Sequence, residues 1–92
     1  MAANVFMNAI FLDQGGQWHK LAESSTVVNA TIMVASSGLT HSDGRINVRF
    51  RGGTSYLWPV DTQVQAEGID LSELEVSRSN TNVRVFVFGY TR

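Results

Sequence analysis

The stretch "TVVNATIMVAS", residues 26–36, decides the fold that the sequence predicts. Its side chains divide into two sets that point in opposite directions when the chain is extended. One set is Val28, Ala30, Ile32 and Val34, and the other is Val27, Asn29, Thr31 and Met33. A repeat of two residues is the period of a β-strand, and β-branched residues dominate the stretch, so we expect a strand here.

The rest of the chain follows the same period, and no long segment repeats apolar residues at helical spacing. We expect strands over residues 5–12, 18–23, 26–36, 45–51, 55–60, 62–68, 72–78 and 83–90. Short strands at spacings of about 8–12 residues are typical of sandwiches and barrels. The sequence therefore predicts an all-β, antiparallel β-sandwich, jelly-roll-like, with seven or eight strands in one domain, residues 1–92. Pro59 cannot donate to a strand ladder, which predicts an edge position or a strand end.

Composition limits the function. The chain has 92 residues, no cysteine, a net charge of −1 and only 16% charged residues. Without cysteine, disulfides and thiolate metal sites are excluded. A sparsely charged, near-neutral surface does not suit the capture of nucleic acid, and it suits a protein that packs against other protein. The apolar start of the chain is shorter than the roughly 20 residues of a membrane-spanning helix and lacks the charges of a signal peptide, so we expect neither.

Two of the expected strands are apolar on both faces. In residues 83–90 a face of valines opposes Phe86, Phe88 and Tyr90, and in residues 5–12 both alternating sets are apolar. The second face is either covered by a loop or a chain terminus, or it is a subunit interface. Both readings stay open, since a domain this small has few loops with which to cover a whole face.

Residues that could carry catalysis are few. The stretch "THSDG" places His41 beside Ser42 and Asp43. Turn chemistry accounts for this stretch, because short polar side chains bond the local backbone and glycine supplies positive φ. The other histidine, His19, stands alone in its expected strand. We therefore expect no catalytic residue and no cofactor.

The stretch "GIDLSELEV", residues 68–76, carries three carboxylates, on Asp70, Glu73 and Glu75. They are the only candidates for a calcium site, but no Asp/Asn-rich loop accompanies them, so we expect no metal. Asp70 followed by Glu73 has the form of a capping box, in which the Asp70 side chain accepts from the N–H groups of Ser72 and Glu73. The sequence predicts one short helical turn near Asp70, with Leu71 in the core.

A strip of arginines lies along one face of the strand expected at residues 45–51. Arg45, Arg49 and Arg51 alternate with inward apolar residues, and Glu73 and Glu75 form an acidic strip at the same spacing. The arginines could be solvated, or could pair with carboxylates of a neighbouring strand or subunit. We favour these readings over nucleic-acid binding, and we expect Arg49 and Arg51 to lie near carboxylates of a partner.

Aromatic residues raise a carbohydrate-binding alternative. Trp18, Tyr56, Trp58 and Tyr90 are the candidates, and Tyr56 and Trp58 are expected to share a strand face. In a domain of this size, large aromatic side chains usually fill the core, so we rank this alternative lower.

The order of elements resembles that of small β-sandwich structural proteins of tailed bacteriophages. The stretches that carry the resemblance are "WHKLAESSTVVNATIMVASSG" (18–38), "INVRF" (46–50) and "VDTQVQAEGIDLSELEVSRSNTNVRVFVFGY" (60–90). Residues 68–72, the strand "LEV" after them, and the final valine-rich strand ending at Gly89 match best. The stretch "SYLWPV" (55–60) departs from the pattern.

This resemblance implies a capsid decoration (cement) protein, which is non-enzymatic and stabilises the capsid lattice as a homotrimer. It implies self-association and the major capsid protein, or another virion protein, as partners, with no nucleic acid and no membrane. The location would be the capsid surface of the virion, after synthesis in the cytoplasm of the host bacterium. A head–tail, tail or fibre component, or a carbohydrate- or receptor-binding module, is the alternative. The residues expected at the oligomer or capsid interface are Phe6, Ile10, Leu12, Arg49, Arg51, Glu73, Glu75, Phe86, Phe88 and Tyr90.

Overall fold

The computed structural model describes residues 4–36 and 44–92. Within these ranges the chain forms eight strands and no helix, which confirms the all-β prediction. The strands are β1 (Val5–Leu12), β2 (His19–Lys20), β3 (Val27–Ser36), β4 (Arg45–Phe50), β5 (Tyr56–Pro59), β6 (Thr62–Asp70), β7 (Leu74–Arg78) and β8 (Val83–Thr91).

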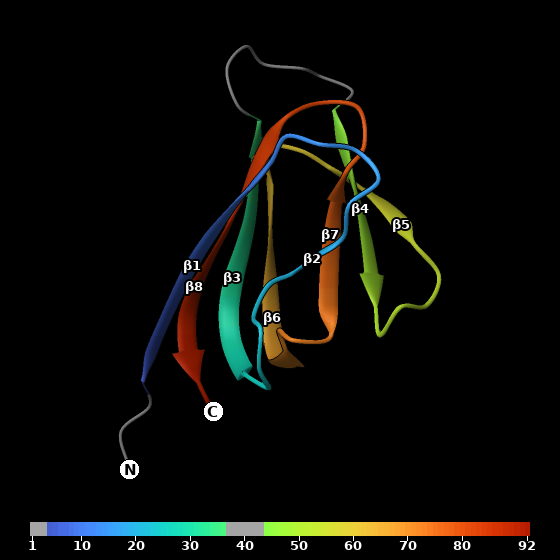
Figure 1. Cartoon of the computed structure of the whole chain (residues 1–92). Helices are drawn as coiled ribbons and strands as arrows, with labels where there is room; N and C mark the ends of the chain where they lie inside the picture. The colour runs from blue at the N-terminus through green and yellow to red at the C-terminus, as the bar shows by residue number, and fades with distance from the viewer. Residues whose placement is uncertain (1–3, 37–43) are drawn as a thin grey trace.

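The strands form two four-stranded antiparallel sheets that pack face to face (Figure 1). Sheet I has the order β1-β8-β3-β6, and sheet II has the order β2-β7-β4-β5. The pairs β1–β8, β2–β7, β3–β6 and β4–β5 show that the first four strands pair with the last four in reverse order. A long antiparallel ribbon rolled in this way is a jelly roll, so the predicted architecture is confirmed.

The core lies between the sheets and is built almost wholly from branched aliphatic side chains. The Val28 set of β3 faces inward and is at most 4% exposed, which confirms the alternation predicted for that strand. The valines of β8, at positions 83, 85 and 87, continue this layer. From sheet II, Ile46, Val48 and Val76 meet them. Each such side chain contributes about 1.5–3 kcal/mol when it is fully buried, so this layer holds the sandwich together.

Gly89 lets β8 pass unusually close to β3. It lies on the inward face opposite Ala30, and a Cβ there would overlap the backbone oxygen of Asn29 and lie 2.5 Å from the Cα of Ala30. No other residue type fits this position without moving a strand.

Some element boundaries differ from those predicted. β2 has only two residues, and β6 continues to Asp70 because it stays paired with β3 past a bulge between Val28 and Asn29. β5 ends at Pro59 and is an edge strand, as its proline predicts. The helical turn predicted near Asp70 is a tight turn between β6 and β7, with no helix.

Candidate interaction surface

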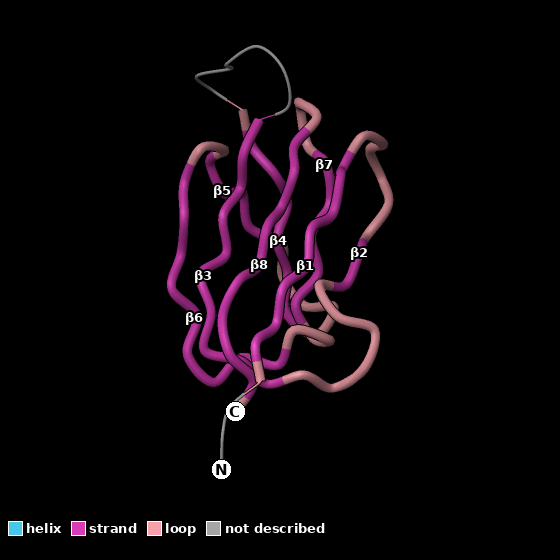
Figure 2. The backbone as a smooth tube through the Cα atoms, turned by 90° about the vertical axis from the view of Figure 1, so that its left-hand side faces the viewer, coloured by secondary structure: helices cyan, strands magenta, loops and turns pink. Residues whose placement is uncertain are grey.

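Large apolar side chains cover most of the outer face of β1 and β8 and reach β3. These three strands lie side by side in sheet I (Figure 2). We call this set the apolar face; its members are Val5, Met7 and Phe11 of β1, Met33 of β3, and Phe86, Phe88 and Tyr90 of β8. Strand register brings them together, because Val5 lies opposite Tyr90 and Met7 lies opposite Phe88. Met7 is 68% exposed and Phe88 is 53% exposed.

Two kinds of polar group border the apolar face. On the β6 side, the Thr31 hydroxyl donates to Oε1 of Gln65 at 3.1 Å. At the other end, the Arg84 guanidinium lies 5.5 Å from the centre of the Phe11 ring. The seven side chains of the apolar face are each 39–68% exposed, and a stable protein interface buries roughly 800 Å² on each partner. An apolar centre with a polar rim is the usual anatomy of such an interface.

The β1 residues predicted at the interface, Phe6, Ile10 and Leu12, lie on the inward face of the strand. Leu12 is 0% exposed, and Phe6 and Ile10 pack against the core. The cause is the register with β8, which places Ile10 opposite Val85 and Leu12 opposite Val83, both inward-facing. Phe86, Phe88 and Tyr90, by contrast, lie on the outer face.

The outer face of sheet II is mostly polar, and two of its arginines pair within the chain. Arg49 lies opposite Glu75 in the β4–β7 register, and the Arg49 Nε donates to Glu75 Oε1 at 2.9 Å. The same guanidinium lies 4.0 Å from the centre of the Trp18 ring. Arg51 pairs with Glu73. The reading in which a neighbouring strand supplies the carboxylates is therefore confirmed, and contact of these arginines with a partner's carboxylates stays a prediction.

Asp70 ties two loops together. Its carboxylate accepts hydrogen bonds from the Ser25 hydroxyl at 2.7 Å, the Thr26 N–H at 3.0 Å, and both the hydroxyl and the N–H of Ser72 at 2.8 and 3.0 Å. These bonds hold the pKa of Asp70 well below its usual range, and the bond from the Ser25 hydroxyl has the largest effect. The predicted cap is confirmed at Ser72, whereas the Glu73 N–H donates to the backbone oxygen of Asp70.

Neither the aromatic candidates nor the acidic ones form a compact site. Trp18 stacks on the outer face of sheet II, Tyr90 lies on the outer face of sheet I, and Tyr56 and Trp58 lie opposite inward-facing residues of β4. Among residues 4–36 and 44–92, no cluster of three His, Asp or Glu side chains could hold a metal ion.

Of the two histidines, only His19 lies among the residues that the structure describes. His19 is half-buried in β2, opposite Val76. His41, Ser42 and Asp43 lie outside the described residues.

Comparison with known proteins adds no assignment: no protein-family model matches the sequence, and no curated protein matches it. In the part of the chain that the structure describes, no helix is long and apolar enough to cross a membrane.

Proposed function

We propose that this protein is a non-enzymatic structural protein of a bacteriophage virion, a capsid cement protein that docks through its apolar face. The observation that carries the proposal is the apolar face itself, seven large side chains in register on one side of sheet I. Contiguous exposed apolar surface of this size is uncommon on monomers and marks sites of protein association.

The way the chain uses its polar residues supports a role in association. Arg49 and Arg51 are engaged by Glu75 and Glu73, and Asp70 is engaged by the loops around it. These charged groups, which the sequence offers for chemistry, stabilise the sandwich. The apolar face has no comparable partner among the described residues, so it is the surface that gains most from a second protein.

The virion setting rests on the resemblance in residues 18–38, 46–50 and 60–90, and the jelly-roll fold is compatible with it. Jelly rolls occur in capsid proteins, and also in lectins and cupins, so the fold alone does not choose between them. A homotrimer would bury part of the apolar face between subunits and present the remainder to the major capsid protein. Repetition over a lattice would multiply a weak contact into stable binding at the capsid surface.

A capsid-binding experiment tests the proposed role in the virion. Expanded heads that lack this protein are mixed with the wild type, with Phe88→Lys or with Gln65→Lys, and are then sedimented and imaged by electron microscopy. Phe88→Lys places a charge in the apolar face, while Gln65→Lys places the same charge on its polar border. We expect ordered density at lattice positions for the wild type and Gln65→Lys, and its loss for Phe88→Lys. Density at the tail or fibres would assign the protein there, and equal binding by all three would refute docking through the apolar face.

A further inference from the structure

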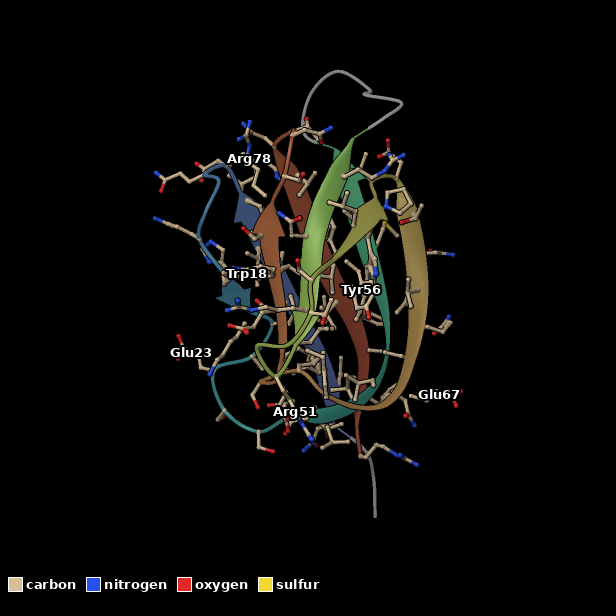
Figure 3. All side chains as sticks on the ribbon, turned by 90° about the vertical axis from the view of Figure 1, so that its right-hand side faces the viewer. Trp18, Glu23, Arg51, Tyr56, Glu67 and Arg78 are labelled. Carbon is tan, nitrogen blue, oxygen red and sulfur yellow. The ribbon has the colours of Figure 1, made fainter. Side chains whose placement is uncertain are left out.

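A cleft opens between the two sheets at the edge farthest from β1. β5 and β6 are joined by a short link but belong to different sheets, and they diverge from that link (Figures 1 and 3). The cleft between them has a volume of about 250 Å³. Its apolar lining includes Phe50, Trp58, Val64 and Ala66. Phe50 and Val64 belong to strand faces that point inward, yet they are 41% and 38% exposed, because the sheets part here.

The β6 edge beside this cleft has no strand partner in the described part of the chain. β6 pairs only with β3, and β5 pairs only with β4. An edge strand of nine residues carries a row of N–H and C=O groups that can pair with another chain. Lysine and proline, which often blunt natural edges, are absent from β6; the strand carries two carboxylates, Glu67 and Asp70, near the bulge at its C-terminal end.

The opposite edge of sheet I shows what a closed edge looks like. There the Asn8 side chain donates to the backbone oxygen of Leu21 and accepts from the Ala9 N–H, both at 2.9 Å. One side chain thus bridges the sheets and occupies a backbone donor of β1. At β6 the Asn29 side chain accepts from the Gly68 N–H at 2.9 Å, but within residues 4–36 and 44–92 no side chain of β6 donates across to sheet II.

The outer side of the β6 edge carries a negative charge. Glu67 borders the cleft, lies opposite Asn29 of the outward-facing set, is exposed, and makes no ion pair within residues 4–36 and 44–92. Arg92 lies beside the neighbouring Gly68, but it is not within ion-pair distance of Glu67. A cationic group on a ligand would therefore be favoured at this position.

We propose that β6 and the cleft form a strand-addition site for an extended segment of another protein. The segment would pair with the free edge of β6 and place apolar side chains, at alternate positions, between Trp58 and Val64. A lysine or arginine of the segment would face Glu67. The cleft is smaller than the roughly 300–1,000 Å³ of small-molecule pockets, which favours one or two side chains over a cofactor. Main-chain pairing gives such sites affinity, and the cleft gives them specificity.

This site is separate from the apolar face, and the proposal does not depend on the function proposed above. A variant that abolishes docking through the apolar face, such as Phe88→Lys, is expected to leave the strand-addition site intact. The two proposals can therefore fail independently.

Amide NMR of the isotope-labelled protein tests the site with a defined probe, the peptide acetyl-Lys-Val-Thr-Val-Thr-Val-Lys-amide. We expect saturable shifts at β5, at β6 and at the Trp58 indole. The same peptide with alternate amides N-methylated, so that it cannot pair with β6, is expected to bind at least tenfold more weakly. No saturable shift at millimolar peptide, shifts confined to β1 and β8, or equal binding of the methylated peptide would overturn the proposal.

A charge exchange tests the part played by Glu67. We expect Glu67→Lys to weaken binding of the lysine peptide about fivefold and to strengthen binding of a peptide with glutamates in place of the lysines. Glu23→Lys is the matched control, since Glu23 is an exposed carboxylate on the opposite side of the molecule (Figure 3). If both variants weaken the lysine peptide equally, Glu67 has no local role and the charge argument is wrong.

Discussion

The outer faces of the two sheets differ in whether their side chains find partners within the chain. On sheet II, Arg49 is held by Glu75 and by the Trp18 ring. On sheet I, Met7 and Phe88 lie side by side and stay largely in solvent. Both faces belong to one small jelly roll with one core. The difference is that arginines on the outer face of sheet II are paired by the chain itself, whereas the apolar face of sheet I stays exposed within residues 4–36 and 44–92.

The largest effect is expected on the inward side of the strand that carries the apolar face. Gly89→Ala would force a methyl group against the backbone of Asn29 and Ala30. We expect a loss of about 3 kcal/mol in the free energy of unfolding, measured by urea denaturation. Gly15→Ala is the control, because a Cβ there meets only the end of the Arg78 side chain at 3.9 Å. If both changes have the same small effect, the close approach of β8 to β3 is not as described.

A smaller effect is expected on the outer face of sheet II. Replacing Arg49 with Gln removes a half-buried ion pair and the contact with Trp18, which we expect to lower stability by about 1 kcal/mol. A double-mutant cycle with Glu75→Gln isolates the pair, and unfolding curves measure it. Association should not change. A variant that stays folded but loses self-association would mean that sheet II also meets a partner, and the contrast between the two faces would fail.

The smallest expected effect is the contribution of Asp70 to stability at low pH. Because the pKa of Asp70 is lower in the folded than in the unfolded protein, the ionised carboxylate stabilises the fold fully above the unfolded pKa of about 3.9. That stabilisation is lost as the pH falls further, towards the folded pKa. Thermal unfolding between pH 6 and pH 2 should therefore show a steeper acid loss for the wild type than for Asp70→Asn. Parallel curves would show that Asp70 does not link its loops to stability.

Much of the fold could be predicted from the sequence, because inward and outward residues differ clearly on most strands. The alternation in β3 and the burial of Leu74 and Val76 in β7 are confirmed for this reason. β1 was not predictable in the same way, since both of its faces are apolar and only the register with β8 turns Leu12 inward.

The surfaces depend on which strands become neighbours, which the local pattern does not contain. Arg49 lies in β4 and Glu75 lies in β7, and β5 and β6 come between them in the sequence. The two residues pair only because the jelly-roll topology makes β4 and β7 neighbours in sheet II. The cleft beside Trp58 has the same origin, because it requires β5 and β6 to part at the edges of different sheets. A sequence pattern could indicate the exposed face of β8, but not the edge at β6.

The most direct test of the apolar face is the mass of the protein in solution, measured by sedimentation velocity over a range of concentrations. Wild type, Phe88→Lys and Gln65→Lys would be compared, with unfolding curves to confirm that all three fold. We expect the wild type and Gln65→Lys to sediment with the mass of a trimer, and Phe88→Lys to sediment as a monomer with an unfolding free energy within about 1 kcal/mol of the wild type. A wild type that remains monomeric at about millimolar concentration, or a Phe88→Lys variant with the wild-type mass, would contradict the account.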